Sequence, residues 1–220
     1  GMKEGEELHH PMVSRAIERA QKKVEAHHFD IRKNLLEYDV VMNEQRKIVY
    51  SERQRVLEGI ELEETAWKMI ENTVLGAVDN YLNPEQKAYD WDYAGLASWA
   101  RRIVKVVVEE KELSALEVKA IEELMLERAK KAFEEKIREL GKEHCPQFLR
   151  FVLLQVIDTR WKEHLHAMDQ LKQGIGLRGY AQIDPKLEYK REGYRMFEEM
   201  RSRLDEEVAT HIMRMKFRED

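Results

Sequence analysis

Turn-forming residues are scarce in this sequence. Ten glycines and four prolines occur in 220 residues, about half of what average usage supplies. An all-β fold needs those residues at its many tight turns, so the composition argues against one. The one cysteine, Cys145, cannot form an internal disulfide and is typical of a reducing compartment. We therefore expect a helical protein of the cytosol.

Long apolar runs are also missing. The longest is the four residues from Phe151 to Leu154, far short of the ~20 that span a bilayer. No charged and then apolar segment opens the chain, so we expect no secretory signal. Even so, 43% of the residues are hydrophobic, which is enough for a core although 37% are charged. These numbers predict a soluble protein of one or two domains.

Charge is unevenly distributed within a net charge of −5. Residues 58–135 carry ten basic and eighteen acidic side chains, a net charge of −8, whereas residues 171–195 carry six basic and three acidic ones, a net charge of +3. The acidic middle argues against a nucleic-acid binder, because such proteins present a basic face. The basic stretch is either a solvated helix end or a contact surface.

One very long helix is predicted from Pro11 to Glu58. Pro11 suits a first helical position, Gly59 suits the position after the last one, and neither residue type occurs between them. Forty-eight helical residues extend roughly 70 Å, which is typical of a scaffold or a coiled coil. Its apolar stripe is interrupted at His27, His28 and Gln45, and the apolar residues recur at helical steps: Val13, Ile17, Val24, Ile31, Leu35, Tyr38, Met42, Val49 and Val56.

Further helices follow in the acidic middle. One is predicted from Glu61 to Leu82, before Asn83-Pro84, and the aromatic, turn-prone residues 83–95 are interpreted as a connection. Ser114 with Glu117 forms a capping-box pattern, which predicts a helix that begins there and ends at Gly141.

The last third of the sequence predicts a helical hairpin. A helix is expected from about Pro146 to Gln173, ending at Gly174. After a loop, Asp184-Pro185 supplies an N-cap and a first-turn proline for a helix to about Phe217. The predicted fold class is all-α.

Several motifs invite a catalytic interpretation that their context does not support. Residues 174–179, GIGLRG, match the dinucleotide pattern by letter, but a predicted helix and not a strand precedes them. His144-Cys145 has no orienting partner, and His164 and His166 fall on different helix faces. No zinc-binding spacing of histidines or cysteines is present. We expect no catalytic site, no metal site and no cofactor in this chain.

The loop at about 174–185 is a better candidate for a functional site. It places Leu177, Arg178 and Tyr180 at the tip of the long hairpin. An exposed tyrosine offers a large amphipathic contact area at low entropic cost, which suits binding of a partner. In the alternative, Tyr180 folds back and caps the hairpin's own core.

Two stretches resemble the SecA family of bacterial preprotein translocase ATPases. FDIRKNLLEYD at 29–39 and MNEQR at 42–46 are similar to that family's long scaffold helix. WKEHLHAMD at 161–169 and QGIGLRGYAQIDPKLEYKRE at 173–192 are similar to its two-helix finger. The resemblance covers essentially the whole chain, although the acidic middle resembles the family's variable wing only in position and helical character.

This resemblance implies a scaffold helix at 1–57, a wing at 58–143, and a continued scaffold with the finger at 144–220. It implies that the scaffold braces the nucleotide-binding motor domains, which would bind ATP and Mg²⁺ outside this chain. The fingertip residues Leu177, Arg178 and Tyr180 would contact the preprotein at the SecYEG channel, and the first finger helix would border the signal-peptide groove. Asp39, Asn43 and Arg46 would face the motor.

The same resemblance implies a cytoplasmic protein peripherally associated with the inner membrane. A homodimer and an indirect contact with anionic lipid are compatible with it, and nucleic acid is not an expected partner. Two positions depart from the family pattern: Val40 stands where a second acidic residue is usual, and His28 stands where asparagine is common. The alternative hypothesis is a self-associating coiled-coil protein built on residues 11–58, without a transport role.

Overall fold

The computed structural model describes residues 11–83, 85–175 and 184–214, and these ranges contain helices and no strand. The all-α prediction is therefore confirmed. In chain order the elements are α1 (Pro11–Glu58), α2 (Leu62–Tyr81), the short 3₁₀ helix η1 (Ala88–Asp90), α3 (Tyr93–Ile103), α4 (Glu110–Ser114), α5 (Val118–Ile175) and α6 (Pro185–Arg214).

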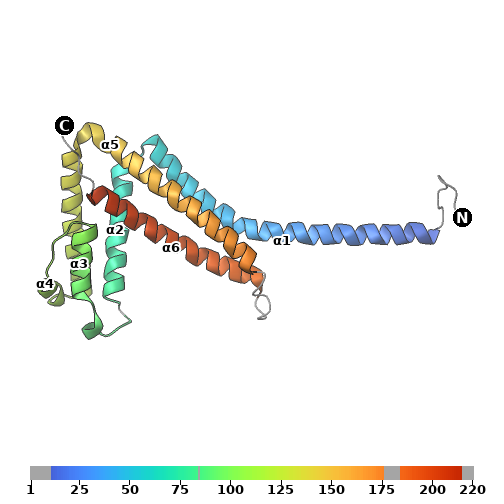
Figure 1. The fold of residues 1–220 in the computed structure, drawn as a ribbon, viewed down its shortest axis with the longest axis horizontal. Coiled ribbons are helices and arrows are strands. Elements are labelled where there is room, and N and C mark those ends of the chain that lie inside the picture. Colours follow the sequence, from blue (N-terminus) through green and yellow to red (C-terminus); the bar gives the residue numbers. More distant parts are fainter. Residues whose placement is uncertain (1–10, 84, 176–183, 215–220) are drawn as a thin grey trace.

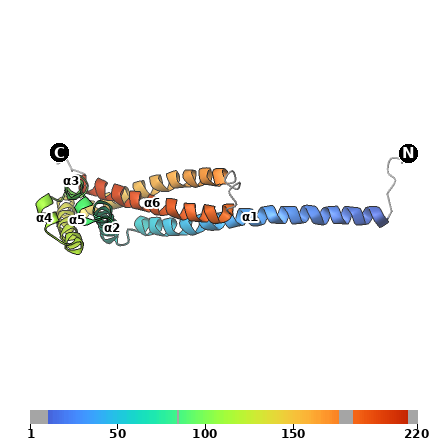
Figure 2. The same cartoon turned by 90° about the horizontal axis from the view of Figure 1, so that it is seen from below.

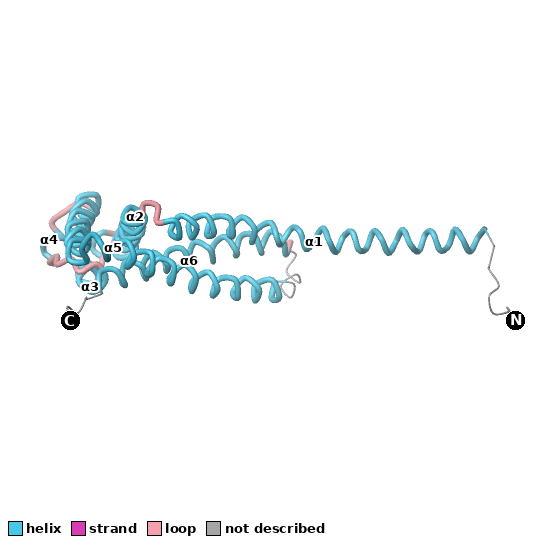
Figure 3. The backbone as a smooth tube through the Cα atoms, turned by 90° about the horizontal axis from the view of Figure 1, so that it is seen from above, coloured by secondary structure: helices cyan, strands magenta, loops and turns pink. Residues whose placement is uncertain are grey.

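The helices form a long arm and a compact end (Figure 1). The C-terminal half of α1, the C-terminal half of α5 and all of α6 run side by side, as a second view also shows (Figure 2). The N-terminal half of α1 extends beyond them without a neighbouring helix. The helices α2, α3 and α4 and the first half of α5 gather at the opposite end, where most of the described loops also lie (Figure 3).

The helix α1 is described from Pro11, and it ends at Glu58, as predicted, in a glycine cap. Gly59 adopts a φ of 75°, its backbone N–H donates to Val56 O at 3.1 Å, and the N–H of Ile60 donates to Arg55 O at 3.0 Å. This is the Schellman arrangement, in which a left-handed glycine satisfies the last carbonyl groups of a helix. Glu61 is also left-handed, with a φ of 50°, so the chain reverses and α2 begins at Leu62.

The helix α5 is two helices that meet at Gly141. That residue has non-helical angles, φ 72° and ψ 158°, which confirms the predicted end at this position. The predicted start at Pro146 is wrong, since helical structure resumes at Lys142 and Pro146 lies inside it. The second part continues to Ile175, two residues beyond the predicted Gln173.

The predicted capping box at Ser114 is wrong. Ser114 is the last residue of α4, and its hydroxyl donates backwards to Lys111 O at 3.3 Å. The turn is held there because Leu113 is fully buried. The following helix begins at Val118, and Glu117 O accepts from the N–H of Ile121 at 3.0 Å.

The connection after α2 contains a helix that the sequence analysis did not predict. The indole N–H of Trp91 donates to Asn83 O at 2.9 Å, which closes the turn that leads into it. Asp92 then caps α3 by accepting from the N–H of Gly95 at 2.7 Å. The helix buries one face, formed by Leu96, Trp99, Ala100 and Ile103, in the core.

The helix α6 begins as predicted. Asp184 Oδ1 accepts from the backbone N–H of Lys186 at 2.9 Å, and Pro185 is the first helical residue. The description of α6 ends at Arg214, so the predicted end near Phe217 lies outside the described residues. None of the helices in the described ranges is both long enough and apolar enough to cross a membrane.

Candidate functional site: the α5–α6 hairpin and its seat on α1

The antiparallel hairpin of α5 and α6 is the only place where the sequence predicts a binding tip. Its two helices leave the described structure at Ile175 and re-enter it at Asp184. The predicted tip residues Leu177, Arg178 and Tyr180 lie between these points, outside the described residues. The described part therefore shows how the base of the tip is held.

The hairpin rests on α1 through a small apolar cluster, which we name the hairpin seat. Met168 and Ile175 of α5 and Tyr189 of α6 are buried there, against Tyr38 and Val41 of α1. The rings of Tyr38 and Tyr189 lie 4.9 Å apart at an interplanar angle of 80°, an edge-to-face contact. Burial raises the pKa of Tyr189 to about 12, and the nearby carboxylates Asp169 and Asp39 add to this.

Charged pairs flank the hairpin seat on both helices. Lys172 Nζ of α5 lies 3.6 Å from Asp39 Oδ1 of α1 and 5.7 Å from the centre of the Tyr38 ring. Lys186 of α6 pairs with Glu37 of α1, and this hydrogen bond raises the pKa of Lys186. The seat therefore joins both arms of the hairpin to the same two turns of α1.

A buried polar chain crosses the three helices one turn further along. Gln45 of α1 and His164 of α5 are 6% and 4% exposed, and His164 Nε2 lies 2.8 Å from Gln45 Oε1. The amide of Gln45 also donates through Nε2 to Gly193 O of α6 at 3.0 Å. Burial lowers the pKa of His164, so the imidazole is held in its neutral form.

Gly193 permits the close approach of α6 to α1 that the buried polar chain requires. A Cβ added at Gly193 would lie 2.7 Å from Met168 Cε and 3.5 Å from Val41 Cγ1. The absence of a side chain thus brings the backbone of α6 within reach of Gln45.

Two ion pairs further along α1 also link it to its neighbours. Arg53 donates to both carboxylate oxygens of Asp158 of α5 at 2.7 and 3.1 Å, and Glu52 pairs with Arg201 of α6.

The predicted scaffold residues Asp39, Asn43 and Arg46 are all exposed. Their spacing of four and three residues places them on one side of α1. Asp39 pairs with Lys172, whereas Asn43 and Arg46 have no hydrogen bond or ion pair within the described part of the chain. Val40, beside them, is 54% exposed. These residues form an open polar face next to the hairpin seat.

Cys145, His164 and His166 are described residues that could invite a covalent or metal-binding interpretation. Burial, with Glu63 beside the thiol, raises the pKa of Cys145 to about 11, so the thiol is not a nucleophile at neutral pH. His164 is buried and His166 is exposed, so the two lie on different faces of α5, as predicted. No group of three or more metal-binding side chains occurs in the described ranges. A helix, α5, precedes the glycine motif at 174–179, which confirms that the motif does not follow a strand.

The sequence pattern does not predict the polar chain. In that pattern Gln45 is an interruption of the apolar stripe of α1, and His164 is only a possible metal ligand. A polar residue at a buried helical position is the one signal that could have suggested a partner, because buried polar groups are almost always hydrogen-bonded.

Comparison with known proteins relates this chain to one protein family. Residues 7–216 match the family described as SecA Wing and Scaffold domain. The chain is similar to the protein translocase subunit SecA of Geobacter sp. (strain M21), with 40% identity over 214 residues, 96% of this chain and 22% of that protein. It is similar to the same subunit of Carboxydothermus hydrogenoformans, with 41% identity over 217 residues, 98% of this chain and 25% of that protein.

A third relative, protein translocase subunit SecA of Halothermothrix orenii, is 40% identical over 219 residues, which cover 100% of this chain and 26% of that protein. The chain thus spans about a quarter of the length of the curated relatives that it matches.

Proposed function

Because the chain belongs to the SecA wing and scaffold family, we propose that it is the coupling and interaction module of a Sec protein-translocation motor. In this proposal the scaffold braces the ATPase domains of a longer parent protein, and the hairpin engages the preprotein at the SecYEG channel. The observation that carries the proposal is the hairpin seat, together with the buried link from Gln45 to His164 and Gly193. It fixes both arms of the hairpin to one long helix.

The module has three parts in this proposal: scaffold residues 1–57, a wing at 58–143, and the continued scaffold with the finger at 144–220. The two strongest breaks in the helices support this division. One is the Schellman end of α1 at Gly59, and the other is the non-helical Gly141 within α5. Each lies within two or three residues of a proposed boundary.

Motion of the motor would reach the finger through α1. Asp39, Asn43 and Arg46 are the proposed contacts to the motor domains, and their exposure beside the hairpin seat supports this. ATP and Mg²⁺ would be bound by those domains, outside this chain. The remaining proposed partners are the signal peptide, an anionic membrane surface reached indirectly, and a second copy of the parent. The parent would act in the cytoplasm at the inner membrane.

The fingertip is tested by Tyr180→Ala in the whole translocase. We expect transport of a preprotein at saturating ATP to fall about 30-fold, which corresponds to the loss of about 2 kcal/mol that is typical of an aromatic hot spot. The ATPase rate without channel and preprotein should stay unchanged. Tyr194→Ala is the control, because Tyr194 is an exposed tyrosine on the same hairpin. Unchanged transport by Tyr180→Ala would overturn the fingertip role.

One observation favours the alternative, a coiled-coil protein. Ile17, Val24 and Ile31 of α1 are exposed and recur every seven residues, which is a coiled-coil spacing. Light scattering on this chain decides the matter. A stable dimer that Val24→Lys with Ile31→Lys converts to a monomer supports self-association, and a monomeric chain contradicts it.

A further inference from the structure

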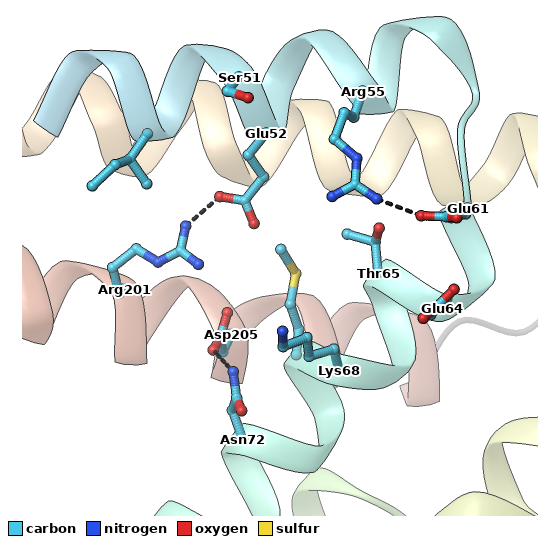
Figure 4. A pocket seen from close by; sticks show the side chains of 12 residues that line it. Ser51, Glu52, Arg55, Glu61, Glu64, Thr65, Lys68, Asn72, Arg201 and Asp205 are labelled. Atoms are coloured by element: carbon cyan, nitrogen blue, oxygen red, sulfur yellow. Dashed lines mark hydrogen bonds and ion pairs between the residues drawn. The ribbon is translucent and has the colours of Figure 1, made fainter. Parts of the chain in front are cut away.

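A groove crosses the place where α1, α2 and α6 meet (Figure 4). It consists of two adjoining hollows of about 390 and 460 Å³. Ile48, Asn72, Arg201 and Asp205 line both hollows, so the two lie side by side along these residues. One end lies at Glu61 and Glu64, at the start of α2, and the other lies at Glu198 and Ser202 of α6.

The lining of the groove carries unbalanced charge. Glu52 pairs with Arg201, and Arg55 pairs with Glu61 (Figure 4). Three further carboxylates, Glu64, Glu198 and Asp205, then face the groove with one further cation, Lys68. The groove thus has an excess of negative charge available to a ligand.

Asp205 is the most unusual of these groups. Its side chain is only 6% exposed, although an isolated buried carboxylate is unfavourable. Its Oδ2 accepts from Asn72 Nδ2 at 2.9 Å, while Oδ1 has no hydrogen-bond partner among the described residues. Burial raises the pKa of Asp205 to about 6. The charged groups that face it are Glu52 of α1, Lys68 of α2 and Arg201 of its own helix.

We propose that this groove binds a basic polypeptide segment, one arginine or lysine side chain of which donates a hydrogen bond to Asp205 Oδ1. A guanidinium or ammonium group supplies both the donor and the charge that this oxygen lacks. Ile48, which is 52% exposed, offers apolar surface beside it for the stem of such a side chain.

A polypeptide fits the shape of the site better than a free cation does. The hollows extend from Asp205 in two directions, so a chain can continue past the bound side chain on both sides, toward acidic groups at each end. A small cation would leave both arms of the groove empty. Asp205 lies about 30 Å along α6 from Pro185, at 1.5 Å per residue, so this site is separate from the fingertip. The proposal does not depend on the proposed function.

The test uses the 220-residue chain and two peptides that differ in one group. One is acetyl-Ser-Leu-Arg-Leu-Ser-amide, and the other carries citrulline, a neutral isostere, in place of arginine. We expect saturable binding of the arginine peptide in calorimetry at pH 7.5, and binding about tenfold weaker for the citrulline peptide, as for the loss of one charge-assisted hydrogen bond. Affinity should fall as the pH is lowered through 6, where Asp205 becomes protonated.

Two variants separate the site from general electrostatics. Asp205→Asn keeps the shape and removes the charge, and it should weaken binding of the arginine peptide about tenfold. Glu206→Gln removes the same charge from the next, exposed residue of α6 and should leave binding unchanged. In the unmodified chain, the carboxyl carbon resonance of Asp205 should show a lower pKa when the peptide is bound.

Three results would overturn the proposal. The first is equal binding of the arginine and citrulline peptides. The second is equal weakening by Asp205→Asn and Glu206→Gln. The third is binding of methylguanidinium alone with the affinity of the arginine peptide, which would make the site one for a small cation.

Discussion

His164 and Gln45 are 119 residues apart in the sequence, and their side chains share a buried hydrogen bond of 2.8 Å. The bond fixes which ring nitrogen of His164 carries the proton. Because Gln45 Nε2 donates to Gly193 O, its Oε1 must accept, so His164 carries its proton on Nε2. One glutamine thus joins α5 and α6 to α1, and this link sets the register of the three helices beneath the hairpin seat.

We predict that Gln45→Leu destabilises the chain. The substitution leaves His164 Nε2 buried without a partner, at a cost of about 1–3 kcal/mol, and leaves Gly193 O with only its intrahelical hydrogen bond. Urea unfolding followed by circular dichroism measures the change in the free energy of unfolding. Gln54→Leu is the matched control, since Gln54 is an exposed glutamine of the same helix, and it should change stability by about 0.5 kcal/mol or less. Equal effects of the two substitutions would contradict a structural role of the polar chain.

Asp205→Asn should stabilise the chain at pH 8. The folded-state pKa of Asp205 is raised from 3.8 to about 6, so the folded state binds more protons than the unfolded state between these values. Its contribution to stability is therefore fully present below pH 3.8 and is lost as the pH rises through 6. We expect the variant to gain about 1–3 kcal/mol at pH 8, by the linkage between pKa and stability, and nothing at pH 3.5.

The comparison of variant with unmodified chain is essential for this measurement. His164 has a lowered pKa, so its contribution runs in the opposite direction and is lost as the pH falls below 6.5. The contribution of His164 to stability is the same in both proteins, so it cancels in the difference between them. Glu206→Gln should show no pH-dependent gain, and a gain equal to that of Asp205→Asn would assign the effect to net charge.

Tyr189→Ala should loosen the hairpin seat. Tyr189 is 2% exposed and lies edge-on against Tyr38, and truncation of a buried aromatic side chain costs about 3–5 kcal/mol. Hydrogen exchange should show faster amide exchange in the first turns of α6, with smaller changes in α2 and α3. Tyr194→Ala, five residues on and 65% exposed, is the control that should leave both stability and exchange almost unchanged.

Cys145 should react slowly with a thiol reagent while the chain is folded. At pH 8 a thiol with a pKa of about 11 is ionised to about one part in a thousand, against roughly a quarter for an ordinary thiol. Reaction with Ellman's reagent should therefore be about 100-fold or more slower in buffer than in 8 M urea. Equal rates would show that the thiol is neither buried nor shifted in pKa.

Much of this fold follows from local patterns in the sequence. The end of α1 is predictable because Gly59 has a backbone preference that acts without any neighbour. The start of α6 is predictable for the same reason, since Asp184 accepts from the N–H of a residue only two positions away. Gly141 ends a helix through its own φ of 72°.

The errors arise where tertiary contacts decide. Ser114 has the local pattern of an N-cap, but the burial of Leu113 holds it at the end of α4. The helix α3 is amphipathic, and its buried face is defined only by the helices around it. The polar chain of Gln45 and the groove at Asp205 each join residues that are more than 100 positions apart in sequence, so no local pattern identifies the partners.

The unaccompanied half of α1 gives small rotations a large reach. From the hairpin seat near Tyr38 to Pro11 the helix continues for about 40 Å, at 1.5 Å per residue, without a neighbouring helix (Figure 1). A rotation of about 5° at the seat moves the far end of such a rod by roughly 3 Å, close to the rise of two helical residues. Displacement grows with distance from the pivot, as in a lever with arms of unequal length. The same rotation therefore displaces the groups at the hairpin seat by only a fraction of an ångström.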